Sequence, residues 1–309
     1  MTKSAKTILD NYQIRKTKKQ KQAFIHWLES HLSEFGYSLQ VDAYSKSGSN
    51  LIAGDVTSAE IILGAHYDTQ PNALFPMAVG FSNWFSFCAS QCVTLLPFLL
   101  LLGLYALLAS FLPAVRSFFP LVFLLYFAFC VQLMCGIANK HTANDNTSGI
   151  VTLLSILEEL PQADRHKVCF VFFDQEELGL VGSQKFYQKY KDSVKGKPLL
   201  NFDCVSDGGT LTFVMKKKFR ASHYCGLLQE ASRQAMANTP KAVRFAHALW
   251  NIYPSDQLHF PSGVGVVAAK KAPLFGYYIN RLHSKWDTCF DPENIALLAD
   301  TMLRLIRSL

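Results

Sequence analysis

The chain has 309 residues, half of them apolar, which is enough for one large α/β domain or two small ones and excludes a disordered protein. Its 30 lysines and arginines exceed its 23 aspartates and glutamates, giving a formal net charge of +7. The basic runs at 15–21 and 216–218 have neither stacking aromatics nor a nucleic-acid fold signature, so we expect no nucleic-acid partner. They are either solvated surface or a site of attraction to anionic lipid head groups.

The eight cysteines form no CxxC pair and no disulfide framework, so we expect free thiols in a reducing compartment. Residues 1–21 contain basic side chains but no apolar core followed by a cleavage site. We therefore expect no cleavable secretory signal.

The first part of the chain predicts a helix and three strands. Apolar side chains recur at helical spacing over 20–36, and Gly36 is placed to end that helix. Strands are expected at 37–45, 50–54 and 59–66. The last of these is continuously apolar, as is typical of a buried central strand.

An apolar segment then interrupts the chain, and Arg116 is the only charged residue between Thr69 and Asn139. The stretches 93–112 and 118–137 are each about 30 Å long as helices, which matches the core of a bilayer. A buried core hairpin is the alternative, but two adjacent uncharged stretches exceed what a domain of this size can enclose. We therefore predict two transmembrane helices.

The upstream part of this segment, 73–91, is less apolar and contains Trp84. These features favour an interfacial helix. The whole membrane insert is accordingly placed at 73–137.

Beyond the insert, helices alternate with strands. The expected helices are 148–160, 177–193, 219–237 and 292–308, and the expected strands are 166–174, 197–206, 209–215, 264–270 and 274–280. This alternation predicts an α/β fold with a mostly parallel central sheet and helices on both faces. We expect 1–72 and 138–309 to form that single domain.

Five short motifs place metal-ligand side chains at or beside the ends of predicted strands, where open α/β sheets build their sites. The motifs are GAHYDT (64–69), TANDNTSG (142–149), FFDQEELG (172–179), NFDCVSDG (201–208) and HSKWDT (283–288). Each alone is weak, because a histidine after a strand is usually structural and a Glu-Glu pair usually caps a helix. Together, two histidines and three carboxylates would give each of two zinc ions one histidine, one terminal carboxylate and one shared carboxylate.

These motifs, in this order, resemble those of the co-catalytic di-zinc exopeptidases of metallopeptidase family 28, which includes bacterial leucyl aminopeptidase and glutamate carboxypeptidase. The resemblance runs from about residue 20 to 309, apart from the insert. It implies the di-zinc exopeptidase fold and two zinc ions. The metal ligands that it implies are His66, Asp145, Glu177, Asp203 and His283.

The resemblance also implies a role for each of these side chains. Asp145 would bridge the two zinc ions, with His66 and Asp203 on one side and Glu177 and His283 on the other. The catalytic residues would be Glu176, as general base, and Asp68, as hydrogen-bond partner of the far nitrogen of His66. By analogy, the segment 255–265 lines the substrate pocket.

The insert lies between two ligand motifs, which constrains its path. Because His66 and Asp145 bind the same metal pair, the chain between them crosses the bilayer an even number of times. We expect a site that faces the membrane, an entrance formed in part by 73–91, and peptide substrates close to the bilayer. The absent signal, the free thiols and the basic runs favour a cytoplasmic domain, although Lys140 and Arg116 give no local charge bias.

The expected function is that of a membrane-anchored zinc exopeptidase, most simply an aminopeptidase. Glutaminyl cyclase or carboxypeptidase activity at the same site is the alternative, and the cyclases of the family use a single zinc. A transport or scaffold protein with a peptidase-like regulatory domain is less favoured, because neither span contains an ionisable residue. Self-association through the apolar helices is left open.

Overall fold

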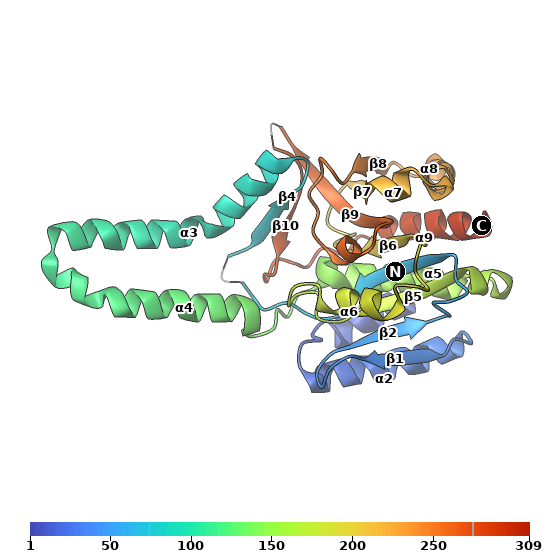
Figure 1. Cartoon of the computed structure of the whole chain (residues 1–309), viewed down its shortest axis with the longest axis horizontal. Helices are drawn as coiled ribbons and strands as arrows, with labels where there is room; N and C mark the ends of the chain where they lie inside the picture. The colour runs from blue at the N-terminus through green and yellow to red at the C-terminus, as the bar shows by residue number, and fades with distance from the viewer. Residues whose placement is uncertain (74, 274) are drawn as a thin grey trace.

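A computed structural model shows an α/β domain from which two long helices project (Figure 1). It describes residues 1–309 except 74 and 274. Both ends of the chain lie on the domain (Figure 1).

The described strands form one ten-stranded sheet. Eight of them lie in the order β1-β2-β5-β3-β6-β9-β10-β4, and the other two branch from β9, where β7 pairs with β9 and β8 pairs with β7. The strands are β1 (Leu39–Ala43), β2 (Ser49–Ala53), β3 (Ile61–His66), β4 (Met77–Gly80), β5 (Val168–Phe173), β6 (Leu199–Phe202), β7 (Thr210–Met215), β8 (Ala242–His247), β9 (Gly263–Ala272) and β10 (Gly276–Leu282). The central strands β5, β3, β6 and β9 are parallel, as expected. The strands that flank this group, β2, β7 and β10, pair antiparallel with it, so the sheet as a whole is mixed.

Helices cover both faces of the sheet, because the side chains of a strand point alternately to either side. In β5, Phe170 and Phe172 join the larger apolar core, whereas Val171 and Phe173 join a second core on the other face. The larger core is completed by α1 (Lys3–Asn11), α2 (Lys18–Glu34), α5 (Ser148–Glu159), α8 (His223–Ala235) and α9 (Pro292–Arg307). The second core is completed by α6 (Val181–Tyr190). Helix α7 (Lys217–Arg220) is a single helical turn.

The sequence predicted most of these elements but misplaced some boundaries. The helix expected from 177 begins at Val181, because a turn with positive φ at Gln175 and Leu180 comes first. The strand expected over 197–206 ends at Phe202, where the chain leaves the sheet to form a ligand loop. Helix α1 and strand β8 were not predicted. In the strand expected at 274–280, residue 274 lies outside the described residues.

The insert forms a helical hairpin. Helix α3 (Trp84–Phe111) has 28 residues, a 3₁₀ turn covers Pro113–Phe118, and α4 (Phe119–Cys135) has 17 residues. By length and composition two helices of the described chain can cross a membrane, and their apolar windows are not buried by the rest of the protein. The membrane crossing itself remains a prediction.

The expectation of an interfacial helix over 73–91 is wrong. Residues Met77–Gly80 form β4, which pairs with β10, and Trp84 begins a helix that continues into the first apolar span. Asn83 caps that helix by accepting the backbone N–H of Ser86 at 2.8 Å. Residue 74 of this segment lies outside the described residues.

Candidate metal centre

Three parallel strands bring candidate ligands to one edge of the sheet. His66 is the last residue of β3 and lies in register with Phe173, the last residue of β5. The turn after β5 carries Glu176 and Glu177, and Asp203 follows β6 directly. Parallel strands end at the same edge, so residues far apart in the sequence meet there.

The structure places two histidines against opposite oxygens of one carboxylate. Nε2 of His66 is 3.2 Å from Oδ1 of Asp145, and Nε2 of His283 is 3.2 Å from Oδ2 of the same residue. Asp203 lies 3.7 Å from His66, and Glu177 lies 3.4 Å from His283. All five ligands implied by the resemblance are therefore together, with Asp145 in the middle.

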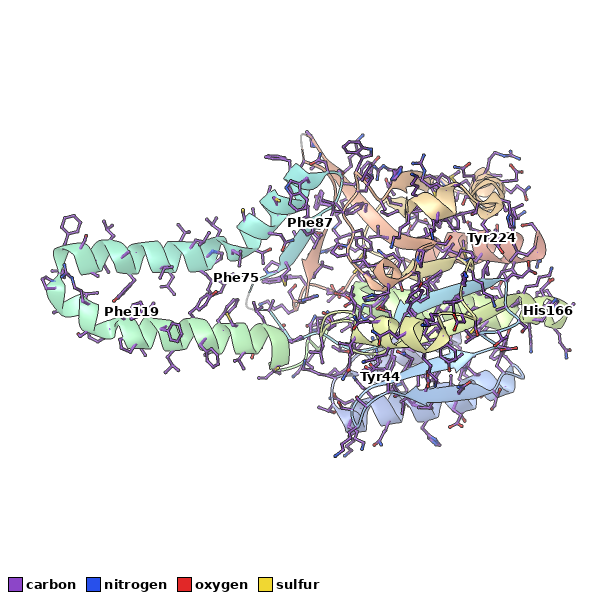
Figure 2. The ribbon with its side chains drawn as sticks, in the orientation of Figure 1. Tyr44, Phe75, Phe87, Phe119, His166 and Tyr224 are labelled. Atoms are coloured by element: carbon purple, nitrogen blue, oxygen red, sulfur yellow. The ribbon has the colours of Figure 1, made fainter. Side chains whose placement is uncertain are left out.

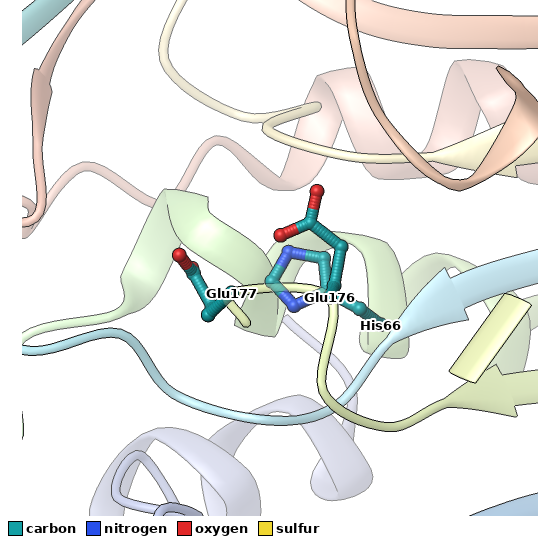
Figure 3. A group of neighbouring side chains, drawn as sticks. All are labelled: His66, Glu176 and Glu177. Atoms are coloured by element: carbon teal, nitrogen blue, oxygen red, sulfur yellow. The ribbon is translucent and has the colours of Figure 1, made fainter. Parts of the chain in front are cut away.

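Glu176 and Glu177 also lie close to His66, and the ligand atoms of these three residues are within 4.8 Å of one another. In Figure 3 the carboxylate of Glu176 reaches over the imidazole, with Glu177 on the same turn. Glu176 is therefore within reach of a group held beside His66.

The electrostatics of this cluster are those of a cation site. Burial raises the pKa of Glu176 well above its usual value, His66 opposes the rise, and Glu177 adds to it. Burial and the charge of Asp145 likewise raise the pKa of Glu177. Burial alone lowers the pKa of His66, but the carboxylates of Asp145 and Asp203 outweigh it and hold that pKa well above its ordinary value. So many carboxylates in one buried place repel one another unless a cation lies between them.

The residues present fit zinc. Imidazole nitrogen with carboxylate oxygen is a donor set that zinc uses in catalytic sites. Both Nε2 atoms face the central carboxylate at 3.2 Å. Two groups of possible ligands share Asp145: one contains His66 and Asp203, and the other contains Glu177 and His283.

Asp68 lies on the far side of His66, but its contacts differ from the expectation. Its Oδ1 is 3.6 Å from Nδ1 of His66, which is too long for a hydrogen bond, and that nitrogen has no hydrogen-bond partner among the described residues. Instead its two oxygens accept the backbone N–H groups of Glu176 at 3.0 Å and Glu177 at 3.2 Å. Asp68 therefore fixes the turn that carries both glutamates.

The loop that carries Asp145 is held by two side chains. The carboxylate of Asp287 accepts the backbone N–H groups of Asn144 at 2.8 Å and Asp145 at 3.0 Å. Oδ1 of Asn146 accepts the N–H of Cys204, next to the ligand after β6. Sequence reasoning placed Asp287 in a motif but gave it no role. The only feature of the sequence that pointed to a role for Asp287 was its position four residues after His283.

Two buried groups near the centre were missed. Asp256 is fully buried, neither of its carboxylate oxygens has a hydrogen-bond partner among the described residues, and burial raises its pKa to about 7. It lies within 255–265, where the sequence indicated a pocket but no particular residue. Arg15 is also fully buried and donates to the backbone carbonyl of Tyr67, between His66 and Asp68, at 2.6 Å. It stood in a run of basic residues that resembled solvated surface.

Comparison with known proteins agrees with this geometry. Residues 132–306 match the family model described as Peptidase family M28. A search of curated proteins gave no match.

Three solved structures illustrate the shared fold. A Zn-dependent exopeptidase from Parabacteroides distasonis has 16% identity and a TM-score of 0.60, with 98% of this chain and 96% of that chain covered. The Legionella pneumophila LapA aminopeptidase has 14% identity and a TM-score of 0.58, with 98% and 69% covered. The Porphyromonas gingivalis glutaminyl cyclase has 18% identity and a TM-score of 0.60, with 99% and 97% covered. At these identities the likeness shows the fold alone. The family match spans more than half of the sequence, and the chain therefore belongs to peptidase family M28, with the fold of the zinc-dependent exopeptidases.

Proposed function

We propose that this protein is a membrane-anchored, zinc-dependent aminopeptidase with two co-catalytic zinc ions. The observation that supports the proposal best is the position of His66 and His283 on opposite oxygens of Asp145. Asp203 completes one group of ligands and Glu177 the other. A structural metal site would need only one such group of ligands. Two groups that share a carboxylate suit a pair of metal ions that catalyse hydrolysis.

The chemistry divides between the metal and the chain. When bound, a zinc pair polarises a carbonyl and lowers the pKa of an attacking water towards neutrality. Glu176 accepts the proton of that water and returns it to the leaving amine. Its raised pKa favours proton uptake, and the positive charge of bound metal would keep it ionised before the reaction.

Two other activities use the same residues. The fold is shared with glutaminyl cyclases, which supports cyclisation of an N-terminal glutamine as the second candidate. Carboxypeptidase activity differs only in how the substrate's end is held. A transport or scaffold role is less favoured because the ligands and Glu176 are all present and clustered.

One experiment separates these candidates. The purified full-length protein is given a peptide library that includes N-terminal glutamine, with and without a zinc chelator, and the products are analysed by mass spectrometry. Release of N-terminal amino acids that stops with chelation supports the proposal. Release from the carboxyl end, ammonia loss without cleavage, or no reaction would each reject it.

The proposal also covers the place of the enzyme in the cell. Two crossings, by 93–112 and 118–137, return the chain to one compartment, and we propose that this is the cytoplasm. The peptidase domain would consist of 1–72 and 138–309 together with β4, which pairs with β10, and its substrates would include apolar peptides near the bilayer. Equal turnover of soluble and lipid-partitioned peptides of the same sequence would argue against that preference.

A further inference from the structure

The base of the hairpin is hydrogen-bonded to the loop that carries His283. Gln132, in the last turn of α4, donates to the carbonyl of Asn72 at 3.1 Å, and the next residue, Ala73, donates its N–H to the carbonyl of His283 at 2.6 Å. Asn139, shortly after α4, donates its side-chain amide to the carbonyl of Ser284 at 3.0 Å. The loop His283–Asp287 therefore lies against the point where the spans meet the domain.

This loop exposes an aromatic and a cationic side chain next to each other. Trp286 is 47% exposed, and Nζ of Lys285 lies 4.8 Å from the centre of its ring system. The residues on either side, Ser284 and Asp287, are buried. The loop therefore presents Lys285 and Trp286 to the outside while its ends are fixed in the metal centre.

The hairpin's dimensions give the depth of this loop. Helix α3 has 28 residues, but it contains Pro97 and is bent in Figure 1, so it extends less than a straight helix of the same length, about 42 Å. Helix α4 is 17 residues, or about 25 Å, so its last turn ends near the boundary of the hydrocarbon core. The loop bonded to that end comes next and falls at the level of the head groups.

Other exposed side chains near the ends of the hairpin have the same character. Trp84, the first residue of α3, is 68% exposed, and Ile137, just after α4, is 75% exposed. Phe75 is 54% exposed, and Figure 2 shows it on the side from which the hairpin leaves. Lys140, five residues after the end of α4, is a further exposed cation. Exposed tryptophan with lysine is typical of a membrane-water interface and is unusual on a surface that meets only water.

We propose that Lys285 and Trp286 form a lipid-contacting surface, with Trp286 in the interfacial layer and Lys285 on the phosphates of anionic lipids. The partner is the bilayer in which the hairpin sits, so the inference rests on the membrane anchoring proposed above. It adds a third attachment, on the ligand loop itself, to the two spans. The metal centre would thereby be held at a fixed depth at the bilayer surface.

Tryptophan quenching tests this contact without reference to catalysis. The full-length protein is placed in nanodiscs of phosphatidylcholine and phosphatidylglycerol, part of the former carrying a nitroxide on its head group. The emission of Trp286 is obtained as the difference between wild type and Trp286→Phe. We expect the nitroxide to remove about half or more of that difference emission, as for an interfacial tryptophan.

Two other tryptophans provide matched controls. Trp27 is partly buried, stacks on Tyr12 and packs against the larger core, so the emission lost in Trp27→Phe should be little quenched. Trp84 begins α3, so the emission lost in Trp84→Phe reports whether the hairpin is inserted. Quenching of Trp84 without quenching of Trp286 overturns the inference and leaves the anchoring intact. Absence of quenching at both overturns the inference together with the anchoring.

A charge reversal tests the role of Lys285. In nanodiscs with phosphatidylglycerol, Lys285→Glu should reduce the quenching of Trp286, and the reduction should disappear in nanodiscs of phosphatidylcholine alone. Lys218→Glu, an exposed lysine on α7, is the matched control and should have no effect. The same quenching for Lys285→Glu and wild type in the anionic nanodiscs would exclude a contact with lipid phosphates.

Discussion

The carboxylate of Asp68 accepts a hydrogen bond of 3.0 Å from the backbone N–H of Glu176. Its other oxygen accepts the N–H of Glu177, so a single side chain behind His66 fixes the candidate base and a candidate ligand together. Because Asp68 comes two residues after His66, the strand that supplies one ligand also positions the turn that supplies another.

Asp68→Asn should therefore lower activity more than it lowers metal content. The amide retains one acceptor oxygen and loses the second, so the turn that carries Glu176 is held by one bond. We expect kcat to fall about 10- to 100-fold, as is usual for a residue that orients metal ligands. Asp55→Asn is the control, because the carboxylate of Asp55 accepts a hydrogen bond in an exposed turn. It should leave kcat unchanged. An unchanged kcat for Asp68→Asn would show that the turn needs no such support.

Glu176→Gln should abolish most turnover and leave zinc in place. The amide has nearly the shape of the carboxylate but cannot accept the proton of the attacking water, so kcat should fall about 10²- to 10⁴-fold. Zinc per chain, measured by mass spectrometry of the metal, should match wild type. Glu230→Gln, on the exposed face of α8, serves as control. Near-wild-type hydrolysis in Glu176→Gln would require another base.

The full-length protein should bind two zinc ions. His283→Ala removes a ligand from the group with Glu177 and leaves the group of His66 and Asp203 complete, so it should retain about one ion. Chelation should remove both ions and lower the unfolding temperature, because bound metal stabilises the folded state. The control His223→Ala, on α8, should retain both zinc ions. A wild-type content of one would favour the single-zinc arrangement.

The pH dependence of stability should include a contribution from Asp207. Burial raises the pKa of this carboxyl, but hydrogen bonds from Arg281 and Lys270 outweigh burial and keep the pKa below its usual value. A lowered folded pKa stabilises the protein above the unfolded pKa, and this stabilisation is lost as pH falls through the folded value.

Asp207→Asn should thus be less stable than wild type at neutral pH, by about 1–3 kcal/mol, with partial exposure of the two cations favouring the lower end. The difference should shrink below about pH 4 as the wild-type carboxyl takes up its proton. Urea unfolding followed by circular dichroism measures both values. A difference that stays constant with pH would mean that the charge of Asp207 is not what stabilises the fold.

Labelling of cysteines in intact cells should reveal the orientation. A cysteine introduced by Ser117→Cys, in the turn between the spans, should react with an impermeant maleimide from outside. Cys225, partly exposed on α8, should react only after the membrane is permeabilised. The reverse pattern would place the catalytic domain on the outer side.

The sequence predicted that these candidate ligands lie together, because His66 ends one strand and Asp203 follows another, and both strands have strong local patterns. The apolar runs before His66 and Asp203 could be recognised without knowledge of their neighbours. Asp256 could not be found in this way, since its importance comes from burial beside residues far away in the sequence. Strand β4 was missed for a related reason. Its partner β10 lies about 200 residues later, and four residues alone carry little strand signal.

The pairing of β4 with β10 limits how a soluble form of this enzyme can be engineered. Removal of 73–137, the insert as the sequence delimits it, would also delete β4 and leave β10 as an open edge prone to association with other chains. It would further remove the N–H of Ala73 that the carbonyl of His283 accepts. A soluble variant should instead omit 84–135 and join the N-cap Asn83 to Gly136 through a flexible linker, because both contacts are then retained.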